Sequence, residues 1–322
     1  MSGIGVVFNP KSGKNLRDPG AARRLARTMG DRGIVREAHS IDELYRIAED
    51  FQRLDIDVLG ISGGDGTNHV TLTGFIDVYK SQSLPQVAFL RGGTMNTVAN
   101  SIGVPRGKAE ALLDRLLRAY AERAVRPLAY AERNVMHIGS AYGFLFGTGA
   151  VYGYLAEYYR QGGGESSPLV AAKTLLGGVG SALVGGEIVS RIAAPFAGWV
   201  EHDDTPTGEM TRWEEREYFA VAGGTIDQIG LNFKPFYRWG EKPGTFHLLG
   251  IHTSAMGFVR DLPRIWRAEP MRDGNTFEAT PTHARLHSKD GTMRYMIDGD
   301  LHEALGPLDV SIGPRVQILP IS

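Results

Sequence analysis

The sequence predicts an α/β protein with two domains. The first has a mostly parallel sheet covered by helices in three layers, and the second is rich in antiparallel strands. Over residues 1–128, short apolar runs alternate with helical patterns, which is typical of a parallel sheet. From residue 129 onward, short β-rich segments are separated by turn residues. A chain of 322 residues, 42% of them apolar, can bury the cores of two modest domains.

The elements of the first domain follow from these patterns in order. Strands are expected at 6–8, 56–61 and 87–90, and helices are expected at 21–30, 41–54 and 108–121. In the helix at 41–54, apolar residues recur at helical spacing, and Ser40 or Asp42 could cap its start.

The second domain is expected to contain strands at 134–138, 142–146, 198–201, 217–222, 245–251 and 293–297. Helical patterns at 149–159 and 169–192 interrupt them. The segment Val316–Pro320 is expected to return to the first domain. The expected domains are therefore 1–128 together with 315–322, and 129–314.

Two glycine-rich segments, Ser62–Asn68 and Arg91–Thr97, each follow an apolar run and precede a plausible helix. Glycine lets the backbone turn tightly and approach a ligand closely, and a helix N-terminus offers unpaired N–H groups to a phosphate. Asp65 adds a carboxylate among those donors. A carboxylate repels a phosphate unless a cation or a proton lies between them, which indicates phosphate chemistry with a metal.

A third segment, Asn9–Lys14, repeats the order of strand, turn and helix. Three such loops at the ends of early strands are expected to line one crevice of an open sheet. The chain lacks the G-x-x-x-x-G-K-[ST] pattern of P-loop proteins. It also lacks G-x-G-x-x-G followed by an acidic residue about 20 positions later, so a Rossmann dinucleotide site is not expected.

Four motifs extend over nearly the whole chain: Asn9-Pro10-x-Ser12-Gly13, Gly63-Gly64-Asp65-Gly66-Thr67, Gly93-Thr94-x-Asn96 and Asp298-Gly299-Asp300. With these motifs the chain resembles the diacylglycerol kinase catalytic-domain family, which includes sphingosine kinases and soluble bacterial lipid kinases. The resemblance implies an ATP-dependent kinase that phosphorylates a hydroxyl group of a lipid acceptor, and a β-sandwich as the second domain.

The resemblance also implies roles for these residues. The first three motifs, with Ser40, would contact the nucleotide, and Asp65 would organise Mg²⁺. Asp298 would accept the proton of the acceptor hydroxyl, and Asp300 would orient or support it. These residues could instead have only local structural roles. Asp and Asn are common in turns, and Asp298-Gly299-Asp300 is also compatible with a hairpin turn.

The chain departs from the family pattern at several positions. Many relatives have Asp where this chain has Thr97, and many have Pro where it has Arg91. Arg91 either offsets phosphate charge or is a solvated surface residue. The segments around Gln228 and Glu241 also differ. Two rivals therefore remain open: an NAD kinase-like small-molecule kinase, and a catalytically silent nucleotide- or lipid-binding module.

Composition limits the classes of partner and of chemistry that are expected for this protein. A net charge of −1 and a pI near 6.8 do not indicate a nucleic-acid partner, and the absence of cysteine excludes disulfides and thiolate chemistry. The N-terminus shows no signal-peptide pattern. Charged residues interrupt the apolar stretch from Leu169 to Val200, so a membrane span is not expected. We expect a cytoplasmic protein in peripheral contact with the inner face of the membrane, and the sequence is compatible with a homodimer.

Overall fold

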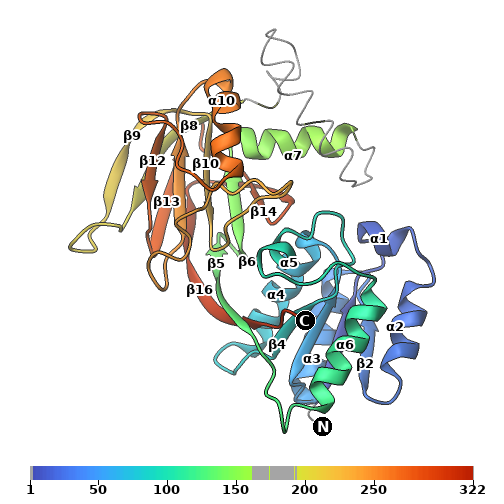
Figure 1. Ribbon diagram of the computed structural model, residues 1–322. Coiled ribbons are helices and arrows are strands. Elements are labelled where there is room, and N and C mark those ends of the chain that lie inside the picture. The colour runs from blue at the N-terminus through green and yellow to red at the C-terminus, as the bar shows by residue number, and fades with distance from the viewer. Residues whose placement is uncertain (1–2, 162–173, 175–191, 193, 322) are drawn as a thin grey trace. The chain divides into compact units, whose positions relative to one another are not determined.

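The computed structural model describes residues 3–161, 174, 192 and 194–321 (Figure 1). It divides into two compact units. Unit 1 comprises Met1–Arg133 and Arg315–Ser322, and unit 2 comprises Asn134–Pro314. Apart from Thr174 and Ile192, the helical pattern expected at 169–192 lies outside the described residues.

Unit 1 is built on a parallel sheet with strand order β2-β1-β3-β4. Its strands are β1 (Ile4–Phe8), β2 (Gly33–Glu37), β3 (Val58–Ser62) and β4 (Gln86–Phe89). Its helices are α1 (Gly13–Leu16), α2 (Ala21–Met29), α3 (Ile41–Arg53), α4 (Asp65–Tyr79), α5 (Thr97–Ser101) and α6 (Ala109–Ala121). The last strand of the chain, β16 (Leu308–Ile318), adds Ile318 beside Val87 of β4 in parallel.

Helices cover both faces of this sheet. Every residue of β1 and β3 is buried, as expected for parallel strands with helices on each side. Helix α2 packs with α6, and α3 packs with α4. Because parallel crossovers are right-handed, the step from β1 to β2 puts α2 on one face, and the return from β2 to β3 puts α3 on the other. The carboxyl ends of β1, β3 and β4 lead directly into the three loops singled out above.

Unit 2 is mostly antiparallel. Its strands are β5 (Ala131–Ile138), β6 (Ala141–Gly143), β7 (Leu145–Thr148), β8 (Phe196–His202), β9 (Thr211–Tyr218), β10 (Ala220–Gly224), β11 (His247–Ile251), β12 (Thr276–Ala279), β13 (His283–Ser288), β14 (Thr292–Ile297), β15 (Asp300–Leu305) and most of β16. One sheet has the order β16-β13-β8-β9, with β5 paired to β16 and β6 paired to β5, and the other has the order β12-β11-β10-β7-β14-β15. Its helices are α7 (Ala150–Gln161) and α10 (Ala255–Trp266).

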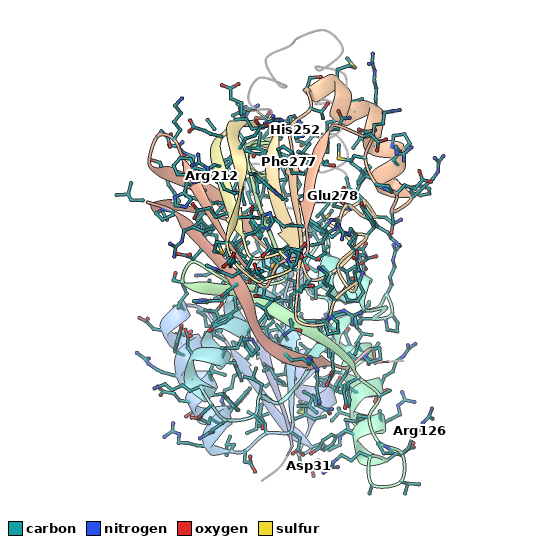
Figure 2. The ribbon with its side chains drawn as sticks, turned by 90° about the vertical axis from the view of Figure 1, so that its left-hand side faces the viewer. Asp31, Arg126, Arg212, His252, Phe277 and Glu278 are labelled. Carbon is teal, nitrogen blue, oxygen red and sulfur yellow. The ribbon has the colours of Figure 1, made fainter. Side chains whose placement is uncertain are left out.

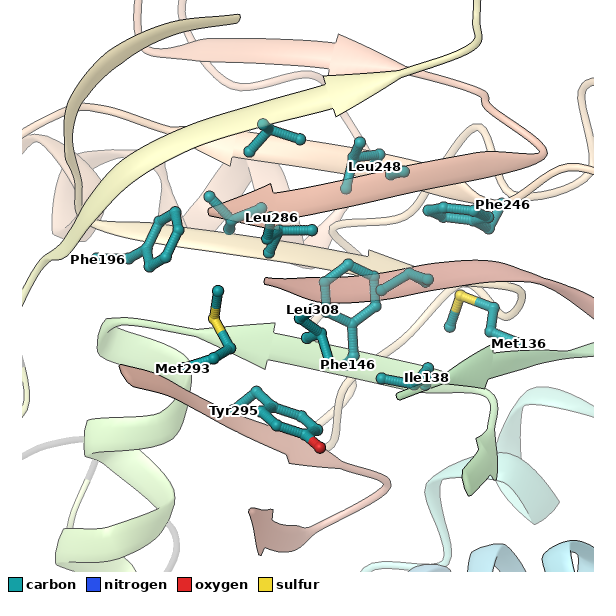
Figure 3. Close-up of a cluster of buried hydrophobic side chains, with 14 of the residues drawn as sticks. Met136, Ile138, Phe146, Phe196, Phe246, Leu248, Leu286, Met293, Tyr295 and Leu308 are labelled. Carbon is teal, nitrogen blue, oxygen red and sulfur yellow. The ribbon is translucent and has the colours of Figure 1, made fainter. Parts of the chain in front are cut away.

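The two sheets of unit 2 pack face to face around one apolar cluster (Figure 3). Phe146 of β7 and Phe246 meet edge to face, with ring centroids 6.3 Å apart. Leu286 of β13 and Leu308 of β16 belong to the same cluster and are buried almost completely. On the β11–β12 edge, the rings of His252 and Phe277 lie 4.7 Å apart (Figure 2). The predicted fold class, a parallel α/β domain followed by an antiparallel β-sandwich, is confirmed.

Helix α10 is absent from the expectations drawn from the sequence. Pro263 lies inside it, and an interior proline removes a helical hydrogen bond, so the sequence pattern argues against a helix there. The side chain of Ser254 accepts a hydrogen bond from the Gly257 N–H at the start of this helix, which is the action of an N-cap. Within the described part of the chain, none of the helices has the length and apolar character needed to cross a bilayer.

Candidate active site

Asn9 ties the loop after β1 to the loop after β3. Its backbone N–H donates to the Ser62 carbonyl at 3.1 Å, and its side-chain Nδ2 donates to Thr67 Oγ1 at 2.8 Å. Its Oδ1 accepts a hydrogen bond from the Lys11 N–H at 2.9 Å. The Asx turn considered from the sequence is therefore present, and the same side chain also reaches the neighbouring loop.

Asn15 and Ser12 complete the connection among the three loops. The Nδ2 of Asn15 donates to the carbonyls of Asn9 and Ser62, each at 2.9 Å. Ser12 Oγ donates to the Gly92 carbonyl at 3.3 Å. Asn15 is buried and was not among the residues predicted from the sequence. A short amide in the α1 turn carries no distinguishing pattern, because its partners come from other strands.

Glycine is required where the second and third loops meet. A Cβ on Gly93 would lie 2.1 Å from the Cα of Gly64, and a Cβ on Gly64 would lie 3.1 Å from the Cα of Gly93. The two backbones therefore touch each other, so these glycines serve the packing of loop on loop as well as any approach to a ligand. Gly63 and Gly66 flank this contact, and Asn96 Nδ2 donates to the Gly93 carbonyl at 2.8 Å.

The Asp65 carboxylate caps helix α5. Its Oδ2 accepts from the Thr97 N–H at 2.9 Å, and its Oδ1 accepts from the Val98 N–H at 3.2 Å. The local N-cap residue, Asn96, makes no side-chain cap bond and has φ of 50°, so Asp65 takes its place from 32 residues away. Burial raises the pKa of Asp65, against the lowering effect of Thr97, Val98 and Arg91.

Arg91 is buried, so its interpretation as a solvated surface residue is wrong. One guanidinium nitrogen donates to the Val104 carbonyl at 2.8 Å, and the other donates to Asn100 Oδ1 at 2.5 Å. Arg91 thus holds the segment that follows the third loop. Its positive charge also acts on Asp65.

A group of basic residues surrounds the start of α1. Partial burial of the Lys14 ammonium group lowers the pKa of Lys14, and the nearby charges of Arg91, Arg17 and Arg106 lower it further. Lys14 Nζ donates to the Arg91 carbonyl at 3.4 Å, and the Lys14 N–H donates to the Gly92 carbonyl at 3.0 Å. Like charges held together in this way form a positive field beside the loops, which favours an anionic ligand.

Of the other residues predicted to contact the nucleotide, three lie in the loops and one lies at the start of α3. Pro10 and Gly13 lie in the first loop, and Thr94 lies in the third. Ser40 caps helix α3: its side chain accepts a hydrogen bond from the Glu43 N–H at 3.2 Å. The structure connects the Ser40 region to the first loop through Lys11, whose Nζ donates to the His39 carbonyl at 2.8 Å.

Asp298 and Gly299 form the two-residue turn between β14 and β15. Their φ values are 45° and 96°, and two consecutive positive φ angles are those of a type I′ hairpin turn. Asp298 is only 2% exposed. Its carboxylate accepts hydrogen bonds from the Phe144 N–H at 3.0–3.1 Å and from the Leu145 N–H at 2.8 Å. The hairpin turn considered from the sequence is therefore present, and the Asp298 side chain also holds the connection between β6 and β7.

Asp300 is the first residue of β15, where it pairs with Ile297. Burial raises the pKa of Asp300, and the charge of His302 lowers it. Among the described residues, no hydrogen bond or ion pair engages the Asp300 carboxylate. The turn before it is fixed by Tyr159 of α7, whose hydroxyl donates to the Gly299 carbonyl at 2.6 Å.

A metal site of three or more protein ligands is not present among the residues that the structure describes. Mg²⁺ is usually held by one or two carboxylates together with substrate phosphates and water. Asp65 supplies one carboxylate beside the phosphate-compatible loops, and its two backbone hydrogen bonds leave lone pairs available. The donor set therefore fits Mg²⁺ that arrives with a nucleotide.

Comparison with known proteins agrees with this geometry. Residues 3–126 match the family model of the diacylglycerol kinase catalytic domain. This confirms the resemblance inferred from the motifs, three of which lie within the matched residues, whereas Asp298-Gly299-Asp300 lies outside them. No curated protein matches the sequence. Among solved structures, the chain is similar to a diacylglycerol kinase from Bacillus anthracis str. Sterne, with a TM-score of 0.62 and 14% identity over 99% of this chain and 96% of that one. A second structure, of a "putative diacylglycerol kinase" from the same bacterium, has a TM-score of 0.66 at the same identity and coverage. At this identity the likeness shows the fold alone.

Proposed function

We propose that this protein is an ATP-dependent kinase that phosphorylates a hydroxyl group of a lipid, such as a diacylglycerol, because residues 3–126 match the family model of the diacylglycerol kinase catalytic domain. The observation that carries the proposal is the junction of three loops in unit 1. Asn9, Asn15 and Ser12 bind the loops to one another, so the loops form one preorganised surface at the carboxyl end of the sheet, where open α/β sheets bind their ligands.

The proposed ATP phosphates bind at the start of α4. Gly64 is the N-cap of this helix and makes no side-chain cap bond, so the first N–H groups of α4 can serve an anion. Lys14 and its basic neighbours add positive charge beside the same loops. Phosphoryl transfer depends mainly on such positioning and charge stabilisation, because the reaction itself needs little covalent chemistry from the protein.

Mg²⁺ would neutralise charge on the phosphates when the nucleotide is bound. In this chain Asp65 is the residue proposed to hold it. The two backbone hydrogen bonds from α5 fix the orientation of the carboxylate, and they link its position to the third loop. Thr97, where many relatives have Asp, contributes a hydrogen bond to Asp65 and no second negative charge.

Asp300 is proposed as the base that accepts the proton of the acceptor hydroxyl. This reverses the roles first assigned to Asp298 and Asp300. Asp298 is buried with its oxygens bound to backbone N–H groups, whereas Asp300 is partly accessible and its pKa is raised by burial. A raised pKa makes a carboxylate a stronger base near neutral pH. Asp298 and Tyr159 then position the turn that carries Asp300.

The experiment is the transfer of label from γ-labelled ATP to an extracted lipid mixture, followed by identification of the labelled product. Label in a lipid monophosphate supports the proposal. Label in a phosphorylated NAD would indicate the NAD kinase-like alternative. Nucleotide binding without any transfer would indicate the silent module.

A further inference from the structure

Helix α10 has one packed side. Asp261 and Ile265 are its buried residues. The Asp261 carboxylate accepts hydrogen bonds from Arg272 at 2.6 Å and from Asn275 at 2.8 Å. Near the start of the helix, the ring of Phe258 lies 4.8 Å from the ring of Phe219. These contacts hold α10 on unit 2 (Figure 1).

The opposite side of α10 is apolar. Met256, Val259, Pro263 and Trp266 follow the spacing i, i+3, i+7 and i+10, which places them along one line of an α-helix with 3.6 residues per turn. By the same geometry this line faces away from Asp261 and Ile265. Trp266 is 54% exposed, Pro263 is exposed, and Met256 and Val259 are partly exposed. We call these four residues the α10 stripe.

Arginines border the α10 stripe. Arg260 and Arg267 are exposed, and within the described part of the chain neither side chain has a hydrogen bond or an ion pair. Arg264 lies on the same flank and donates to the Pro270 carbonyl at 2.7 Å. The acidic residue of the helix, Asp261, is buried and already bound to Arg272. The accessible charge of the helix is therefore positive.

We infer that the α10 stripe is a docking surface for an anionic lipid bilayer, with α10 lying in the plane of the interface. An apolar line flanked by arginines is the pattern of interfacial helices. The Trp266 ring suits the boundary between headgroups and acyl chains, and the arginines suit anionic headgroups. Self-association through the α10 stripe is disfavoured, because the arginines of a second copy would face the arginines of the first and repel them. The inference rests on the proposed lipid acceptor, because a kinase of membrane lipids must reach a bilayer.

The first test is co-sedimentation with vesicles in the absence of ATP, so that vesicle binding and kinase activity fail or succeed separately. The full chain should bind vesicles of phosphatidylcholine with phosphatidylglycerol more tightly than vesicles of phosphatidylcholine alone. Each arginine near an anionic surface strengthens binding about fivefold, so Arg260→Glu with Arg267→Glu should weaken binding by at least about 25-fold. Equal binding by this variant and the wild type would overturn the inference.

A matched control has the same change in net charge at another place. Arg115 on α6 and Arg126 are exposed residues of unit 1, and Arg126 is marked in Figure 2. Arg115→Glu with Arg126→Glu should leave vesicle binding within about twofold of the wild type, since long-range attraction is screened within about 10 Å at 0.1 M salt. A loss as large as that of the α10 variant would mean that net charge, and not this helix, controls binding.

The second test locates the contact. The chain has no cysteine, so Pro263→Cys and Ser83→Cys each give a single site for an environment-sensitive fluorophore. With anionic vesicles, emission from position 263 should shift to the blue, and emission from position 83 in unit 1 should not. An unchanged spectrum at 263 would contradict docking through the α10 stripe. A shift at 263 that depends on protein concentration and not on vesicles would assign the surface to self-association.

Discussion

Asp298 and Asp300 lie two residues apart, and the structure predicts opposite effects for their replacement by asparagine. In Asp298→Asn, one oxygen can still accept from Phe144 and Leu145, but the new NH₂ group faces the Phe144 N–H that Oδ2 now accepts at 3.0 Å. The substitution replaces a charged acceptor by a neutral one and sets two N–H donors against each other. It should therefore lower the free energy of unfolding by about 1–3 kcal/mol. For a domain of this size, that corresponds to a fall in Tm of about 2–12 °C.

Asp300→Asn should stabilise the fold. Burial raises the pKa of Asp300, so the folded state disfavours the ionised form, and at neutral pH this costs stability. The cost is absent below the ordinary pKa of aspartate and grows as pH rises toward the raised pKa. The variant should therefore have a higher Tm than the wild type at pH 7–8, and the difference should shrink as the pH approaches about 4.

The two variants should also separate in turnover. If Asp300 is the base, Asp300→Asn should lower kcat by about 10²–10⁴-fold with little change in ATP affinity. The acid limb of the wild-type kcat profile should lie above the ordinary aspartate range, since activity is lost as pH falls through the raised pKa of Asp300. Asp298→Asn should lose stability first and retain most of its turnover below its melting temperature.

The assay is label transfer to lipid at saturating ATP, with Tm and ATP affinity measured on the same preparations. Loss of turnover in Asp298→Asn at unchanged Tm, together with normal turnover in Asp300→Asn, would show that Asp298 and not Asp300 is the base. Loss of ATP affinity in either variant would indicate a metal-organising role instead.

Three further outcomes follow from unit 1 and from the turn. Asp65→Asn should abolish phosphoryl transfer while the protein stays folded, whereas Asp77→Asn, which removes an exposed charge from the same helix, should not; equal turnover in both would remove Asp65 from the mechanism. Gly93→Ala and Gly64→Val should weaken ATP binding in calorimetry, because the added side chains crowd the contact between two backbones at a cost of about 1–3 kcal/mol. As the control, Gly240→Ala should bind ATP as the wild type does, because a Cβ at position 240 meets no atom within 4 Å. Unchanged affinity in both loop variants would place the nucleotide elsewhere. Tyr159→Phe should lower kcat about fivefold by removing one hydrogen bond to the turn and leave the KM for ATP unchanged, and a changed KM would assign Tyr159 to the nucleotide.

The sequence predicts those parts of the fold that depend on local patterns. Apolar periodicity identifies α3. Ser40 or Asp42 was expected to cap its start, and the structure shows that Ser40 does so, because its side chain accepts a hydrogen bond from the Glu43 N–H. The glycine loops were identified because glycine, aspartate and serine have distinctive roles after a strand. Strand–helix alternation likewise predicts the parallel sheet of unit 1.

The sequence does not predict contacts that depend on distant register. Asp65 caps α5 only because β3 and β4 are neighbours, so that two loops 32 residues apart meet. The same holds for Asn15 against Ser62 and for Asp298 against Leu145, which lie 47 and 153 residues apart. Helix α10 was missed for a local reason, since Pro263 opposes helix propensity and tertiary packing of Asp261 and Ile265 overrides it.

The most direct test of the proposed function is product identification after incubation of the wild-type protein with γ-labelled ATP, Mg²⁺ and a lipid extract, beside Asp65→Asn under the same conditions. Label should enter the organic phase as a lipid monophosphate with the wild type and not with the variant. Label that stays in water-soluble products, or that enters lipid equally with both proteins, would contradict it.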